Sequence, residues 1–317
     1  MNFLSPFLSF LLIVLLLSCK QNKSESIESS LEKKDFIRIF AQARPGGEAF
    51  DFQMPVDLGL DSLKITEQSK AILDNNELVL GMVIGNTPIA VPIKVLSGFE
   101  VANLRIASDN YLLTWCPLVG SARVFDGKIK EDTLGFDFGR GLIDNNLLLV
   151  DRRTKTVWNQ LSNEAVQGVL KGEKLSPYPS IQSTWEFWKG RYPKTKVVMS
   201  TDTSNAVFPE SVLQKQYYNI WIPGNEYPNN TTHETTNLGL GAVLAETSVF
   251  IRLEELFKED SPLLYEINGQ KFFVHFDAAG LTAWVEDENK KLVPSTMVYD
   301  WAWKNFYPDA EEINKLE

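Results

Sequence analysis

The stretch CPLVG at residues 116–120 is the clearest candidate for chemistry, because Cys116 is one of only two cysteines in a chain of 317 residues. A thiolate is a nucleophile and a redox group, and its reactivity depends on what lowers the pKa of the thiol. The flanking runs 111–115 and 122–125 resemble strands, so no helix N-terminus is expected beside the sulfur. Backbone N–H groups of the turn are another way to stabilise a thiolate. The alternative is an inert cysteine packed against Trp115, since cysteine is among the most buried residue types.

A second group of polar side chains follows in DRRTKTVWNQ, residues 151–160. Arg152, Thr154 and Gln160 offer a guanidinium, a hydroxyl and an amide, which are parts of a polar binding pocket. The alternative is a plain β-hairpin, in which the aspartate opens the turn and the tryptophan enters the core. We therefore predict Cys116 as the catalytic candidate and these three residues as the binding candidates.

Metal and cofactor sites find no support in the sequence. The two histidines, His233 and His275, have no second His or Cys within ligand spacing. No glycine-rich phosphate loop and no Gly-x-Ser-x-Gly nucleophile elbow occurs. We therefore predict no metal and no cofactor, and we expect His275 to be an ordinary core or surface histidine of a strand.

The other cysteine indicates the compartment. Residues 7–17 form an apolar run of signal-peptide length, and LLSC at residues 16–19 has the form of a bacterial lipobox. We predict a signal peptide over residues 1–18, acylation of Cys19 and a flexible polar tether over residues 19–34. The protein is then lipid-anchored to a membrane of the bacterial cell envelope. Because residues 1–18 lack Lys and Arg, an uncleaved anchor or an ordinary signal peptide is the alternative.

The composition limits the partners. The chain carries 31 basic and 41 acidic residues, a net charge of −10, which argues against nucleic acid as a partner. With 44% hydrophobic residues the chain can bury a substantial core. If Cys19 is acylated, Cys116 is the only free thiol and no intramolecular disulfide can form.

Strand patterns dominate the rest of the chain. Short apolar runs bounded by turn residues occur at 78–84, 89–95, 147–150 and 271–276, and they predict strands and hairpins. Helical patterns are fewer, at 185–192 after a capping-box spacing that begins at Ser183, and at 252–258. The prediction is an α+β protein, β-dominated with short helices, in which residues 35–317 form a single globular domain.

Three sequence echoes recur in the same order along the chain. Leu80 begins a segment similar to the one at Leu240, the stretch ending at Trp158 is similar to the one ending at Trp284, and WEFWKGRYP is similar to DWAWKNFYP. Ordered repetition of this kind predicts two related halves, about 78–200 and 238–317, packed as a pseudo-symmetric pair. The second half has no counterpart of the segment that contains Cys116.

Several of these segments together resemble a bacterial family known as domain of unknown function 3179. The similar pieces are LGMVIGNTPIAVPIKVL, TWCPLVGSARVFDG, GLIDNNLLLVDRRTKTVWNQ, STWEFWKGRYPKTKVVMS and DWAWKNFYPD. The hallmark of the family resembles Cys-Pro-Leu-Cys-Gly, and some members place selenocysteine in that region, which implies redox or thiol chemistry. Here Cys116 matches the first cysteine, whereas Val119 stands where the second is expected.

Two functional hypotheses follow. In the first, the envelope lipoprotein uses Cys116 as a monothiol, in redox exchange or as a nucleophile. In the second, it is a non-catalytic binding or scaffolding module that has lost a dithiol site, because valine cannot resolve a disulfide. Neither hypothesis requires a cofactor, and neither identifies the small-molecule or protein ligand.

Overall fold

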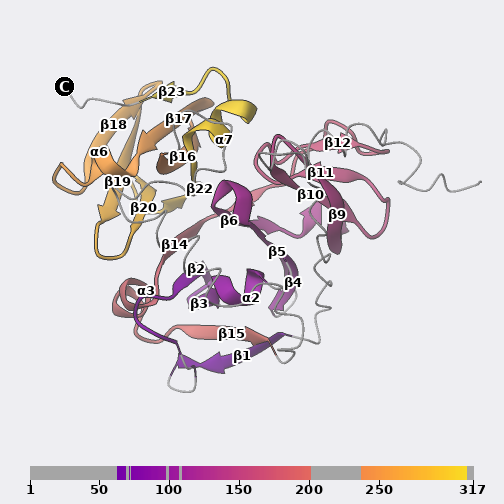
Figure 1. Ribbon diagram of the computed structural model, residues 1–317, viewed down its shortest axis with the longest axis horizontal. Coiled ribbons are helices and arrows are strands. Elements are labelled where there is room, and N and C mark those ends of the chain that lie inside the picture. The colour runs from indigo at the N-terminus through magenta and orange to yellow at the C-terminus, as the bar shows by residue number, and fades with distance from the viewer. Residues whose placement is uncertain are drawn as a thin grey trace, which may run out of the picture. The chain divides into compact units, whose positions relative to one another are not determined.

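Strands dominate the computed structural model, which describes residues 63–68, 71, 73–97, 100–106, 109–200 and 237–312. Five small sheets follow one another in a propeller-like arrangement, with four short helices beside them (Figure 1). The expected β-dominated α+β class is confirmed. The predicted signal peptide, Cys19, the tether and His233 lie outside the described residues.

The first sheet has five strands in the order β1-β15-β3-β2-β14, drawn from two separate parts of the chain (Figure 1). The hairpin of β2 and β3 turns at Gly85, whose φ of 58° is a left-handed conformation that glycine adopts at little steric cost. β15 pairs with β3 in parallel, and the other strand pairs of this sheet are antiparallel. The strands are Leu63–Glu67 (β1), Leu78–Ile84 (β2), Thr87–Pro92 (β3), Ser180–Thr184 (β14) and Lys196–Ser200 (β15).

The second and third sheets are antiparallel and lie between β3 and β14 in the chain. The second has the order β13-β6-β5-β4 and contains the Cys116 turn between β5 and β6. The third has the order β12-β11-β10-β9. Their strands are Val101–Ile106 (β4), Asp109–Cys116 (β5), Ser121–Asp126 (β6), Phe136–Ile143 (β9), Asn146–Asp151 (β10), Val157–Asn159 (β11), Ala165–Gln167 (β12) and Pro177–Tyr178 (β13), with a small ribbon of Lys128–Ile129 (β7) and Asp132–Thr133 (β8) beside them.

The fourth and fifth sheets are built from the C-terminal part of the chain. The fourth has the order β22-β16-β17-β23, with β23 parallel to β17, and the fifth has the order β18-β19-β20-β21. The strands are Leu238–Leu244 (β16), Thr247–Arg252 (β17), Leu263–Ile267 (β18), Gln270–Asp277 (β19), Thr282–Asp287 (β20), Leu292–Val293 (β21), Ser295–Tyr299 (β22) and Glu311–Glu312 (β23).

The helices are short and two of them correct the sequence-based expectations. The strand expected to reach residue 95 ends at Pro92, because proline lacks an N–H for the ladder, and Ile93–Ser97 forms the helix α2. The cap of α3 (Trp185–Arg191) is Thr184 rather than Ser183, since the Thr184 hydroxyl accepts a hydrogen bond from the Phe187 N–H at 3.4 Å. The remaining helices are Leu253–Leu256 (α6) and Asp300–Phe306 (α7).

The strands β14-β2-β3-β15 of the first sheet correspond to the strands β22-β16-β17-β23 of the fourth, both in their order and in the register of their pairing. Leu80 pairs with Gln182 on β14, and Leu240 pairs with Met297 on β22. The third and fifth sheets correspond in the same way, because Trp158 pairs with Leu149 and Trp284 pairs with His275. The described second sheet, which carries Cys116, has no counterpart among the sheets after β16.

A tryptophan from a short helix packs against a glycine in both the first and the fourth sheets. A Cβ atom on Gly81 would lie 2.2 Å from an indole carbon of Trp188, and one on Gly241 would lie 2.5 Å from an indole carbon of Trp303. Both tryptophans are buried. The absence of a side chain at each glycine therefore allows helix α3 or α7 to rest on its sheet.

Gly81→Ala is expected to lower the free energy of unfolding by about 1–3 kcal/mol, because the added methyl overpacks against a rigid indole. Gly190→Ala is the matched control. Its Cβ meets nothing within 4 Å and it lies in α3, so alanine should leave stability unchanged or raise it by up to about 1 kcal/mol. Urea unfolding measures both, and equal values for the two variants would contradict this account of the packing.

Candidate functional site

The Cys116 turn joins two neighbouring strands through one turn of 3-10 helix. Cys116 ends β5 and pairs with Ser121 at the start of β6, and residues Pro117–Val119 form the helical turn between them. Gly120 closes the turn with φ 68°, and its N–H donates to the Pro117 carbonyl at 3.3 Å. A helical turn was not expected here, because the glycine and the β-branched residues that follow read as strand. The turn is too short to supply a helix dipole of the kind that activates cysteines.

The Cys116 sulfur lies inside the protein. The residue is 1% exposed and packs in a hydrophobic cluster that includes Val119, Tyr299 and Trp303. The thiol donates a weak hydrogen bond to the Asn145 carbonyl at 3.6 Å. Burial, and then the charge of Glu100, raise the pKa of the thiol to about 12. In this state Cys116 is protonated and shielded, which is the environment of an inert thiol.

The same turn also contains groups that favour a thiolate. The backbone N–H groups of Leu147, Val119 and Leu118 act against the rise in the pKa of the thiol. The sulfur therefore has local stabilisation of negative charge, but burial outweighs it.

Glu100 is a neighbour of the sulfur that sequence reasoning missed. Its residue is 3% exposed, and burial raises the pKa of its carboxyl from 4.5 to about 8. Its Oε1 atom is buried without a hydrogen-bond partner among the described residues. The backbone carbonyl of Glu100 accepts a hydrogen bond from Trp115 N–H at 2.8 Å, so the acid is held beside the end of β5. The available signal was a lone charge in the run VLSGFEVANL.

Gln160 lies next to the turn but is used internally. It is fully buried, and its amide nitrogen donates to the Thr114 hydroxyl at 2.9 Å and the Ser121 carbonyl at 3.1 Å. Its amide oxygen accepts from Asn146 at 2.8 Å. On the other side of β6, Gln182 accepts from Ala122 N–H at 3.0 Å. These side chains anchor the strand that follows the turn.

Arg152 and Thr154 lie in the turn between β10 and β11. The Thr154 hydroxyl donates to Asp151 at 2.6 Å, and Asp151 also accepts from the Trp158 indole N–H at 3.2 Å. Arg152 donates to Asp137 at 2.7 Å in a partly exposed ion pair. Of the three binding candidates, Gln160 thus contacts the two strands that flank the Cys116 turn, whereas Arg152 and Thr154 make hydrogen bonds within a hairpin and its neighbouring strand.

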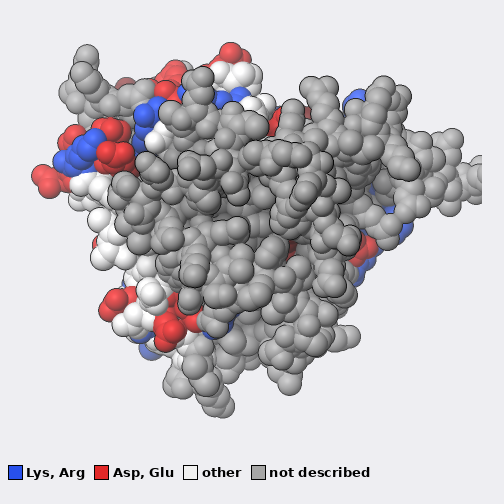
Figure 2. All heavy atoms as spheres, in the orientation of Figure 1, with Lys and Arg blue, Asp and Glu red and all other residues white. Residues whose placement is uncertain are grey.

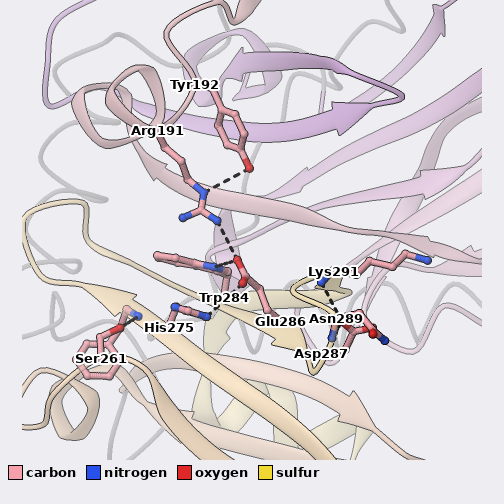
Figure 3. A network of polar contacts seen from close by, with 10 residues as sticks. Arg191, Tyr192, Ser261, His275, Trp284, Glu286, Asp287, Asn289 and Lys291 are labelled. Carbon is pink, nitrogen blue, oxygen red and sulfur yellow. Dashed lines mark hydrogen bonds and ion pairs between the residues drawn. The ribbon is translucent and has the colours of Figure 1, made fainter.

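A second cluster of polar side chains joins α3 to the fifth sheet (Figure 3). Glu286 accepts hydrogen bonds from Arg191 at 2.9 Å and from the Trp284 indole N–H at 3.1 Å. His275 stacks on Trp284 with an angle of 7° between the ring planes, and the Nε2 atom of His275 lies 3.4 Å from a carboxylate oxygen of Glu286. Burial lowers the pKa of His275, and Arg191 adds to this while Glu286 opposes it. The histidine expected to be ordinary therefore belongs to a charged junction.

The described residues contain no group of three or more His, Cys, Asp or Glu side chains that could hold a metal ion. Within the same residues every helix is too short or too polar to span a membrane. Where their surface is visible in Figure 2, basic and acidic side chains lie intermingled.

Taken together, the described residues form a strand-dominated protein of small sheets with a buried Cys-Pro turn. Residues 61–209 match the family described as "Protein of unknown function (DUF3179)", and over this segment the chain resembles that family. The match includes the Cys116 turn, Glu100 and the 151–160 hairpin, and it ends before β16. No curated protein and no solved structure matches this chain.

Glu100→Gln is expected to remove a pH dependence of stability. The unfolded chain loses the Glu100 proton near pH 4.5, whereas the folded protein keeps it until about pH 8. Wild-type stability should therefore fall as pH rises through this window, and the variant should gain relative to wild type by an amount on the order of a few kcal/mol. Urea unfolding at several pH values measures the difference. A stability difference that is the same at all pH values would contradict the buried acid.

Proposed function

We propose that this protein is a lipid-anchored protein of the bacterial cell envelope whose folded part is a non-catalytic binding or scaffolding module. The burial of Cys116 is the observation that carries the proposal. A thiol that is 1% exposed and whose pKa is raised to about 12 is neither reachable nor ionised near neutral pH.

The residue at position 119 supports the same function. Val119 is fully buried in the cluster that holds Cys116, and the only cysteine among the described residues is Cys116 itself. A dithiol cycle needs a second sulfur within reach of the first. In this chain the turn serves to pack neighbouring sheets against one another rather than to exchange electrons.

The lipid anchor rests on the sequence of the N-terminus. LLSC at residues 16–19 follows an apolar run, and such a sequence directs cleavage before the cysteine and its acylation. More than one acyl chain holds a protein stably on a membrane. The membrane is therefore the first partner we assign to this protein.

We also propose that the halves 78–200 and 238–317 are related repeats. The support is the shared strand order of the first and fourth sheets, and the matched registers of Leu80 with Leu240 and of Trp158 with Trp284. The second sheet is then an insertion into the first half. We therefore assign ligand binding to the inserted second sheet.

A monothiol function of Cys116 is the second candidate. The observations in its favour are the three backbone N–H groups that act against the rise in the pKa of the thiol, and the buried Glu100, whose carbonyl accepts from Trp115 N–H. Burial weighs against this candidate, since a reagent must reach the sulfur.

Thiol reactivity is expected to separate the two candidates. In the full chain with Cys19→Ser, Cys116 is the only thiol, and the leading proposal expects iodoacetamide to modify it no faster than the protein unfolds. Mass spectrometry measures the modification, and the same sample in urea is the control for complete labelling. Cys116→Ala should then cost on the order of 1 kcal/mol through lost packing. Rapid labelling of the folded protein at neutral pH would favour the monothiol instead.

Cys19→Ser is also expected to release the protein from membranes and to abolish incorporation of a labelled fatty acid, because the acylated thiol is removed. Cell fractionation and labelling with an alkyne fatty acid measure the two effects. Cys116→Ser is the matched control and should remain acylated and membrane-bound. A Cys19→Ser protein that stays in the membrane through an uncleaved N-terminus would show that the lipid-anchor proposal is wrong.

A further inference from the structure

The only histidine among the described residues, His275, lies where helix α3 meets the fifth sheet (Figure 3). Its side chain is 23% exposed, and its ring stacks on Trp284 with 5.1 Å between the ring centroids. Histidine is the side chain whose charge ordinarily changes between about pH 5 and 8. A contact between two parts of the fold that contains such a group can therefore respond to pH.

Helix α3 touches the β19–β20 hairpin through an apolar contact and through an ion pair. The Phe187 ring lies 5.4 Å from that of Trp284, and a Cβ on Gly280 would come within 2.8 Å of Phe187. Arg191 donates to Glu286 at 2.9 Å, and its guanidinium carbon lies 4.7 Å from the centre of the Trp284 ring. The ion pair is the part of this contact that a new charge nearby can disturb.

Glu286 provides the carboxylate of this contact, and its two oxygens face different partners (Figure 3). Oε1 accepts from Arg191 and from the Trp284 indole N–H at 3.1 Å, whereas Oε2 lies 3.4 Å from Nε2 of His275. Arg191 also donates to the Tyr192 hydroxyl at 3.3 Å. The Glu286 side chain is 11% exposed, so charges interact here more strongly than in water. When His275 is protonated, two cations share this one carboxylate.

Other charged side chains on the same face of the sheet do not restore the balance. Side chains alternate along β19, so Lys271 and Asp277 lie on the face that carries His275. The carboxylate of Asp277 accepts a backbone N–H at 2.6 Å, and β18 places Glu266 opposite Lys271. Among the described residues, only the carboxylate of Glu286 lies within 4 Å of a ring nitrogen of His275.

We propose that His275 is an acid-sensitive latch, whose protonation weakens the contact of α3 with the fifth sheet. The protonated imidazole competes with Arg191 for Glu286, and the two cations repel each other beside the Trp284 ring. Helix α3 then keeps its apolar contact with the hairpin but loses the full strength of its ion pair.

The titration of His275 has the sign that the latch requires. Burial lowers the pKa of His275 from its ordinary value of 6.5, Glu286 acts against this, and Arg191 adds to it. The unfolded chain therefore takes up the proton first, and stability that is present above pH 6.5 is lost as the pH falls below it. The inference concerns α3 and the fifth sheet alone, and it does not depend on the function proposed above.

Hydrogen exchange of the full chain, read by mass spectrometry over α3 and the β19–β20 hairpin, tests the latch. Between about pH 7.5 and about pH 5, protection corrected for the intrinsic effect of pH should fall roughly two- to fivefold in wild type, as for a partly exposed ion pair. His275→Gln should remove this change, because glutamine stays neutral. His233→Gln is the matched control, which removes the histidine outside the described residues and should keep the change.

Arg191→Gln tests the competition for Glu286. Without the guanidinium, protonated His275 meets the carboxylate unopposed, so acid should no longer loosen α3, although α3 is less protected at every pH. The pKa of His275 measured by NMR should rise in this variant. Lys189→Gln, on the same helix and bonded to Asn75, is the control and should behave as wild type. Acid loosening that persists in Arg191→Gln would overturn the competition.

Two further results would overturn the latch itself. One is wild-type protection that is the same at both pH values, and the other is equal loosening in His275→Gln, because another group would then be responsible. If His275→Gln does not fold, NMR titration of the wild type decides. Protonation of His275 that leaves the α3 amides unchanged rules the latch out, whereas α3 shifts with the same midpoint support it.

Discussion

The arrangement of the sheets around the Cys116 turn depends on the hydrogen bonds that side-chain amides make to the backbone of residues 120–122. The neighbouring strand β13 reaches β6 only at Val124 and Phe125, so the start of β6 lacks a strand on that side. Gln182 replaces it, because its amide accepts from Ala122 N–H and donates to the Gly120 carbonyl at 3.4 Å. Removing such a partner would leave buried backbone groups unsatisfied at about 1–3 kcal/mol each. Gln160, from the third sheet, satisfies the Ser121 carbonyl in the same manner.

The burial of the thiol follows from this anchoring. The start of β6 is held by the first and third sheets, and the Ser121 hydroxyl lies 2.8 Å from Thr296 on the fourth. Gly120 approaches Tyr299 so closely that a Cβ would lie 3.1 Å from its ring. Four of the five sheets therefore meet at the turn, and their side chains cover Cys116. The packing of these sheets therefore keeps the sulfur away from solvent.

Contacts between residues close in the chain were readable in the sequence, whereas the distant residues that enclose Cys116 and Glu100 were not. The Asp151 turn and the entry of Trp158 into the core follow from residue types within seven positions, and the hairpin alternative for them describes the structure. The role of Gln160 depends on Thr114 and Ser121, which are about 40 positions away in the chain. A lone glutamate in an apolar run does not reveal that Glu100 is enclosed. The cover over Cys116 comes partly from residues near position 300, which no local pattern connects to the turn.

Gln160 and Glu286 stand two residues after Trp158 and Trp284, and their different chemistry matches the different surroundings. An amide donates and accepts, so Gln160 can satisfy a carbonyl and a hydroxyl of the second sheet while accepting from Asn146. A carboxylate only accepts, so Glu286 needs donors, and it takes them from Arg191 and the Trp284 indole. The second sheet has no counterpart after β16, and α3 supplies a cation at that junction instead. The two junctions therefore differ in the side chain that joins them: an amide contacts the second sheet at one, and a carboxylate pairs with Arg191 and lies near His275 at the other.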